Sequence, residues 1–227
     1  MYTTAISYRT AEQINQAMGR VYGHMGLAVL TSMIVSYLVG TSPSLLEFFF
    51  GSWVRWIVIF APLVFIFAVP ALLESKIGRA GKVLTLHAFA AMMGLSFATI
   101  FAVYTMASII EAFMGGVVLF GTMSFYGYFT KQSLDSLGKY LLVGLIAIVI
   151  ASLINLFVGS TVAQMVISAI AILVFLGLTA YDTQRIRELV TDNDADDSIE
   201  IMGAITLYLD FINLFLSLLQ LFGSKKD

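Results

Sequence analysis

Seven long apolar stretches constrain this chain more than any other feature. They lie at about residues 21–39, 53–73, 83–104, 113–129, 140–158, 162–182 and 201–222. A helix needs roughly 20 largely apolar residues to cross the hydrocarbon core of a bilayer. Hydrophobic residues make up 59% of the chain and charged ones only 11%, whereas a soluble domain carries roughly 25% charged residues. We therefore predict an all-α membrane protein with seven transmembrane helices.

The connecting segments are short, and the only hydrophilic one of any size is residues 183–200. No linker separates one part of the chain from another, which favours a single polytopic domain over residues 1–227 with a short polar segment at 1–20. That polar start lacks the apolar core of a cleaved signal peptide. The net charge of −2 and the lack of a basic run argue against nucleic-acid binding, and the absence of cysteine excludes disulfides and thiol chemistry.

Lys and Arg are distributed unevenly between the two sides. With the N-terminus inside, nine of the twelve basic residues fall on the inner side, and positive charge gathers on the cytoplasmic side of membrane proteins. The three on the outer side are Arg55, Lys225 and Lys226. We predict a cytoplasmic N-terminus. The two C-terminal lysines run against the bias, so full crossing and re-entry both remain open for the last segment.

Two lone aspartates are the sharpest feature of the sequence. Asp182 is the only charged residue between Lys139 and Arg185, and Asp210 lies alone between Glu200 and Lys225. If the sixth helix runs on to about residue 190 and the seventh begins near 199, the two carboxyls lie roughly 12 Å and 16 Å from the inner helix ends. Consecutive spans run antiparallel, so we expect the two aspartates to lie at similar depth. An intramembrane carboxylate is costly and usually functional.

Other polar residues share the helix faces of the two aspartates. On the last span, the positions within about 80° of Asp210 on a helical wheel are Thr206, Asn213, Ser217 and Gln220. A similar stripe on the sixth span holds Gln164, Ser168, Thr179 and Asp182. Such stripes face protein or water rather than lipid, which leaves two readings open: a polar path, or hydrogen bonds that pack the helices.

Two carboxylates cannot both ionise cheaply where water is scarce, so we expect one proton to be shared between them. The pair would join two helices while it holds the proton, and would repel or recruit a cation after losing it. Carboxylate oxygens suit Ca²⁺, so Asp182 and Asp210 are candidate calcium ligands as well as candidate pH sensors. No other cofactor is indicated.

The segments GLTAYDTQRI at 177–186 and ITLYLDFINLFLSLLQLFG at 205–223 closely resemble those of the Bax inhibitor family, and MSFYGYFTK at 123–131 is similar to its bacterial members. The resemblance implies a seven-helix fold with the last helix in the centre of the other six. It also implies a pH-sensitive calcium leak in the bacterial inner membrane, gated by a di-aspartyl pair that falls on Asp182 and Asp210. Lipid, calcium and protons would then be the partners, and nothing indicates a specific protein partner.

The same resemblance implies a basic latch after the second span that pairs with the sixth-span aspartate in the closed state. Here that neighbourhood reads ESKIGRAGK at 74–82, which leaves Lys76 and Arg79 as the two candidates. The acidic residue that some relatives carry within the second span is missing, as is the Gly-Pro that many carry in the third.

Other membrane-protein functions also use buried carboxylates. An intramembrane aspartyl protease also pairs a Tyr-Asp span with a second aspartate, but it carries Gly-x-Gly-Asp there and a later Pro-Ala-Leu. This chain reads Tyr-Leu-Asp and has no proline after Pro70, so we expect no enzymatic activity. A retinal protein would need a lysine in the last span, and none is present. A proton-coupled transporter and a regulatory membrane protein remain alternatives.

Overall fold

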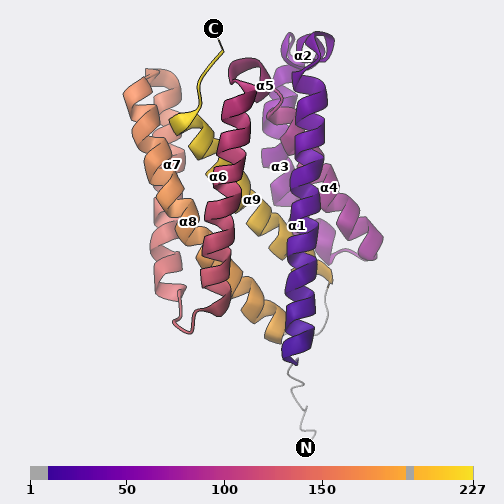
Figure 1. Ribbon diagram of the computed structural model, residues 1–227. Coiled ribbons are helices and arrows are strands. Elements are labelled where there is room, and N and C mark those ends of the chain that lie inside the picture. Colours follow the sequence, from indigo (N-terminus) through magenta and orange to yellow (C-terminus); the bar gives the residue numbers. More distant parts are fainter. Residues whose placement is uncertain (1–9, 193–196, 227) are drawn as a thin grey trace, which may run out of the picture.

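The fold is all-helical in the computed structural model, which describes residues 10–192 and 197–226 (Figure 1). Within those ranges, seven segments are long and apolar enough to cross a membrane. They are formed by the helices α1 (Ala11–Gly40), α3 (Val54–Glu74), α4 (Arg79–Ser96) with α5 (Ile100–Val103), α6 (Met106–Phe129), α7 (Asp135–Val158), α8 (Thr161–Asp192) and α9 (Asp197–Phe222). A short helix, α2 (Pro43–Phe50), connects α1 to α3. The predicted seven-span, all-α fold is confirmed.

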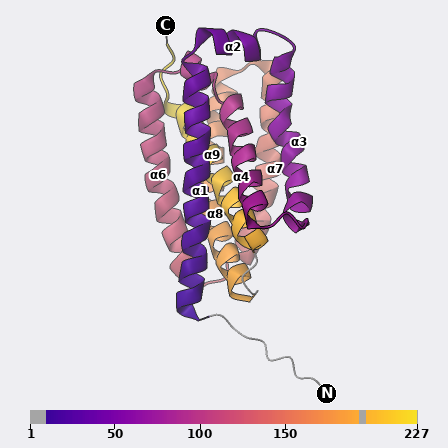
Figure 2. The same ribbon diagram turned by 90° about the vertical axis from the view of Figure 1, so that its right-hand side faces the viewer.

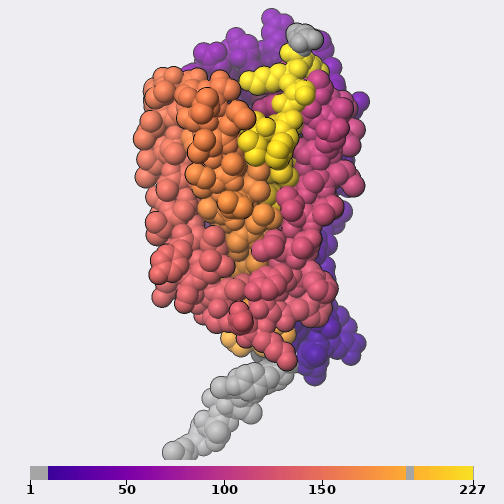
Figure 3. Space-filling view, turned by 60° about the vertical axis from the view of Figure 1, so that its left-hand side comes forward, coloured from indigo at the N-terminus to yellow at the C-terminus, as the bar shows by residue number. Residues whose placement is uncertain are grey.

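Helix α9 occupies the middle of the bundle. Two-thirds of its apolar window (67%) is buried, against 39% or less in the other candidate spans. It packs against α1, α3, α4, α6 and α8, and it runs obliquely behind α1 and α6 (Figures 1 and 2). Helix α7 lies outermost and packs on α8 (Figure 3). Five of the other six spans therefore supply the main contacts of the central helix, and α7 reinforces one of them.

The helices extend beyond the apolar stretches of the sequence because polar residues cap them. The first helix begins at Ala11 rather than near residue 21, since Thr10 and Gln13 form a reciprocal capping box. The fourth span begins at Met106 rather than near 113, where Thr105 accepts a hydrogen bond from the backbone N–H of Ser108. Residues 11–20 of the predicted polar segment are thus helical.

The two ends of the bundle differ. The starts of α1 and α9 and the end of α8 lie at one end, which we call the N-terminal end (Figure 1). Helix α2 and the end of α9 lie at the other, the C-terminal end. At that end residues 224–226 run beside the connection between α5 and α6, where the backbone N–H of Lys226 donates to the carbonyl of Val103 (2.9 Å).

Close helix approaches fix the position of α8. Gly127 of α6 lies so near the backbone of Ala180 that a Cβ at this position would overlap with the Ala180 carbonyl. Glycine lets two backbones approach in this way, as in many membrane helix pairs. Because Ala180 precedes Asp182 by two residues, this contact also positions the aspartate of α8.

Candidate functional site: the aspartate pair and its cavity

The structure brings the two lone aspartates together. The side chains of Asp182 on α8 and Asp210 on α9 lie close enough to interact with each other. Asp210 is only 5% exposed, whereas Asp182 is half-buried. Helix α8 continues to Asp192 and α9 begins at Asp197, close to the ends assumed from the sequence. The antiparallel arrangement and the two helix lengths therefore place the carboxyls at the same level.

A hydrogen bond between two carboxyl groups requires a proton on one of them, because a carboxylate can only accept. Asp210 Oδ2 is buried, and no amide, ammonium, guanidinium or hydroxyl group in the described ranges donates to it. An ionised Asp210 would thus be an unsatisfied charge in the interior. Two carboxyls this close can share one proton, and a second negative charge on such a pair carries an electrostatic cost.

A cavity of about 620 Å³ reaches the pair from the N-terminal end of the bundle. Asp182 forms part of its wall, together with Thr206 one turn before Asp210 on α9. The other lining residues come from four helices: Pro70, Leu73, Glu74, Lys82, Arg185, Ile186, Leu189, Ser198, Ile199, Met202 and Gly203. Asp210 is not among the lining residues. Of the two aspartates, Asp182 is therefore the one that ions and water in the cavity contact.

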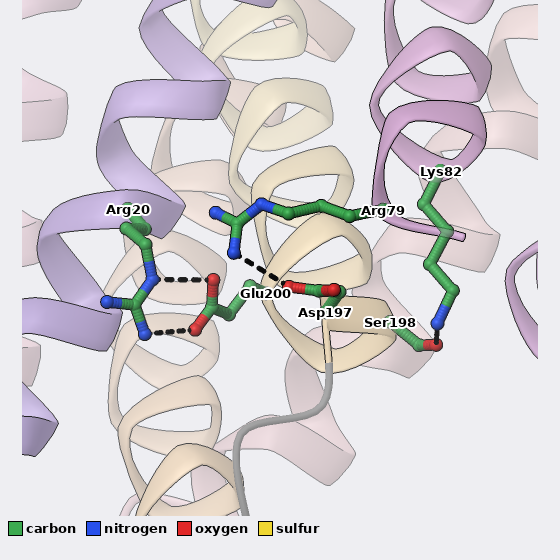
Figure 4. A network of polar contacts seen from close by, with 6 residues as sticks. All are labelled: Arg20, Arg79, Lys82, Asp197, Ser198 and Glu200. Carbon is green, nitrogen blue, oxygen red and sulfur yellow. Dashed lines mark hydrogen bonds and ion pairs between the residues drawn. The ribbon is translucent and has the colours of Figure 1, made fainter.

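The two basic residues predicted as the latch do not pair with Asp182 in the described part of the chain. Arg79 Nη1 instead contacts Asp197 Oδ1 at 2.9 Å (Figure 4), and Lys76 is exposed. Arg185, which follows Asp182 by three residues on α8, interacts electrostatically with Asp182. A latch formed by Lys76 or Arg79 remains a prediction for another conformation.

Lys82 is the basic residue of this segment that shares the cavity with Asp182. Its Nζ donates to Ser198 Oγ at 2.5 Å (Figure 4). Ser198 in turn donates to the carbonyl of Leu73 at 2.9 Å. In the sequence, Lys82 stands out only as one of the basic residues of the inner side. Its position one turn into α4 indicated that it could face the bundle, but nothing in the sequence paired it with α9.

A second buried carboxylate, that of Glu200, was not among the site residues predicted from the sequence. Glu200, 3% exposed, accepts two hydrogen bonds from Arg20 of α1, at 2.8 Å from Nε and 2.5 Å from Nη2 (Figure 4). This fork geometry suits guanidinium and carboxylate. Together with the Arg79–Asp197 pair, it ties the first turn of α9 to α1 and α4. The acidic residues Asp194 and Asp196 of the same connection lie outside the described residues.

Most of the predicted polar path is satisfied within its own helices. The side chains of Thr179, Thr206, Asn213 and Ser217 each donate to the backbone carbonyl four residues earlier. Such bonds let a polar side chain lie among apolar neighbours without a partner on another helix. Of these residues, only Thr206 also lines the cavity.

Gln220 is the member of the stripe that bonds between helices. Its Oε1 accepts from Gln164 Nε2 at 2.6 Å and from Ser168 Oγ at 3.1 Å. Asn155 Nδ2 of α7 donates to Gln164 Oε1 at 3.2 Å. This amide cluster joins α7, α8 and α9 towards the C-terminal end. The polar stripe is therefore open at the aspartates and closed by hydrogen bonds at its far end.

A calcium ion at the pair would find few protein ligands. No group of three or more His, Cys, Asp or Glu side chains within residues 10–192 and 197–226 is arranged to hold a metal. Calcium takes six to eight oxygen ligands, so two carboxylates would leave most of its hydration shell in place. The geometry suits a transient site on a path better than a tight one.

The chain is similar over most of its length to proteins of one family. Residues 14–227 match the family profile described as inhibitor of apoptosis-promoting Bax1. The inner membrane protein YbhL of Escherichia coli K12 is 38% identical over 215 residues, which cover 92% of each chain. A protein of Rickettsia prowazekii is 34% identical over 99% of this chain and 96% of its own. A membrane protein of Streptococcus pyogenes serotype M3 is 34% identical, covering 92% of this chain and 93% of its own.

Proposed function

Because this chain belongs to the Bax inhibitor family, we propose that it is a pH-sensitive calcium leak gated by the Asp182–Asp210 pair. The observation that carries the proposal is the closeness of two buried or half-buried carboxyls, one of which lines a cavity of about 620 Å³. The chain is a multi-pass membrane protein by its seven candidate spans. The inner-membrane relative supports the bacterial inner membrane as its location, and the bias of basic residues supports a cytoplasmic N-terminal end.

In the proposed closed state the shared proton holds α8 and α9 together. Loss of the proton leaves two carboxylates side by side in a poorly solvated site, where their repulsion is much stronger than in water. A cation that enters from the N-terminal end can then bind Asp182, which faces the cavity, and reduce the repulsion between the two carboxylates. The leak should therefore be small at acid pH and increase as the pH rises.

Calcium flux into liposomes that contain the purified protein tests this gate. Wild type should admit Ca²⁺ increasingly as the pH rises, and both Asp182→Asn and Asp210→Asn should abolish that pH dependence because the titrating pair is gone. Glu188→Gln is the matched control, since Glu188 is an exposed carboxylate on α8. Absence of flux from wild type, or an unchanged pH profile in both asparagine variants, would refute the di-aspartyl gate.

The same preparation separates the alternatives. A proton-coupled transporter would change the pH of the liposome lumen while it moves a solute. A leak would carry Ca²⁺ down its gradient without coupled transport of a solute. Cleavage of a membrane peptide that either asparagine substitution abolishes would instead reveal an aspartyl protease.

A further inference from the structure

An apolar groove of about 350 Å³ opens on the bundle surface near the C-terminal end. Helices α1 and α6 form its two walls, with Met33 and Ile110 among the exposed residues at its rim. Phe211 and Phe215 of the central helix α9 form its floor. Figures 1 and 2 show α9 behind the space between α1 and α6. The groove thus gives the surroundings direct access to the helix that carries Asp210.

The surroundings of this groove are hydrocarbon. Its walls are almost entirely apolar, and apolar cavities of this kind do not hold ordered water. Because α1 and α6 are both candidate spans, the groove opens sideways into the bilayer. An acyl chain is the occupant that matches both the lining and the medium.

The two C-terminal lysines, which oppose the charge bias of the rest of the chain, lie at the end of this groove. Lys226 Nζ donates to the carbonyl of Phe101 at 2.7 Å, and Phe101 lines the groove. Lys225 pairs with Tyr104 in a short antiparallel bridge. A lysine ammonium has three N–H donors, so the bond to Phe101 leaves donors on Lys226 for a further oxygen. Both lysines are exposed.

We propose that the groove and the two lysines together bind one anionic phospholipid from the leaflet at the C-terminal end. One acyl chain lies between α1 and α6, and the phosphate contacts Lys225 and Lys226. The site is independent of the proposed calcium leak. It also accounts for two basic residues on the side of the membrane that otherwise has few.

Lipid retention measured by native mass spectrometry tests the headgroup contact. We expect the full-length protein in detergent to retain one dioleoyl phosphatidylglycerol and to retain the zwitterionic phosphatidylcholine with the same chains more weakly. A basic residue near a membrane surface contributes enough to anionic lipid binding that each lysine removed should weaken retention about fivefold. Lys225→Ala with Lys226→Ala should therefore lose the preference, while Lys139→Ala, an exposed lysine on α7, should keep it. Equal retention of both lipids by wild type, or a preference that survives the double substitution, would overturn the proposal.

The acyl contact is tested by a fluorescent reporter at the rim. In a background with Trp53→Phe and Trp56→Phe, Ile110→Trp places an indole beside the groove, and Ile146→Trp places one on the outer face of α7. Both positions are more than half exposed (55% and 52%), so the substitutions should be tolerated. One equivalent of phosphatidylglycerol with brominated acyl chains, added in detergent, should quench the residue-110 reporter and not the residue-146 one. Equal quenching of the two would show that no chain is held in the groove and would overturn the proposal.

Discussion

Arg20 and Glu200, which are 180 positions apart in the chain, form a two-point ion pair between α1 and the first turn of α9. The pair lies at the N-terminal end, close to the Arg79–Asp197 pair (Figure 4). The central helix is therefore fixed to α1 by charge at the end where the cavity opens. Movement of α9 relative to α1 would have to break this contact.

Removal of the guanidinium should destabilise the fold. Arg20→Ala leaves the Glu200 carboxylate, 3% exposed, without its two donors, which should lower the free energy of unfolding by about 1–3 kcal/mol. Unfolding in detergent micelles, followed by circular dichroism, measures this change. Arg79→Ala is the matched control: its pair with Asp197 is exposed, and such pairs contribute less than about 1 kcal/mol. Equal losses in the two variants would contradict the buried role of Glu200.

A methyl group at Gly127 should separate α6 from α8. Gly127→Ala places a Cβ against the Ala180 carbonyl, and overpacking of this kind costs about 1–3 kcal/mol. Gly121→Ala, on the same helix with open space around its Cβ position, should be neutral or stabilise by up to about 1 kcal/mol. Thermal unfolding of the two variants provides the comparison. A loss of stability for Gly121→Ala as large as that for Gly127→Ala would show that the close approach is not the cause.

Water access to the stripe should differ along α9. The chain has no cysteine, so a single introduced cysteine is the only thiol that a reagent can label. Thr206→Cys lines the cavity and should react rapidly with a charged thiol reagent. Ser217→Cys, at a position only 7% exposed near the amide cluster, should react slowly.

Sidedness of the same labelling tests the orientation. A membrane-impermeant reagent should reach Thr206→Cys in inverted inner-membrane vesicles, where the cytoplasmic side faces out, and not in right-side-out vesicles. The opposite pattern would place the N-terminal end outside.

The amide cluster should keep the far end of the stripe closed. Gln220→Leu removes the acceptor of both Gln164 and Ser168, which should cost about 1 kcal/mol of stability and raise calcium flux at every pH. Gln16→Leu, at an exposed position on α1, is the control and should change neither quantity. If Gln220→Leu loses stability as expected but its calcium flux is unchanged, the amide cluster is not what closes the far end of the polar stripe.

Apolar length and helix periodicity were enough to predict several features from the residues alone. Seven spans follow from the length of the apolar stretches, because a bilayer demands that length from any crossing helix. The contact between Asp182 and Asp210 follows from two helix lengths and the antiparallel order of consecutive spans. These are local quantities, or nearly so, and they do not depend on which other helices lie beside the pair.

The ion-pair and hydrogen-bond partners that side chains find on distant helices could be seen only in the tertiary structure. Arg20 and Glu200 looked like independent charges at the ends of apolar stretches, and Arg79 was a candidate partner for Asp182 but contacts Asp197. Gln220 bonds to Gln164, while its neighbours on the stripe bond within their own helices. Periodicity gives the face on which a side chain lies, but the helix opposite that face depends on how the whole bundle packs. The sequence by itself therefore determined the spans and the aspartate pair, and the packing around α9 decided what holds that pair in place.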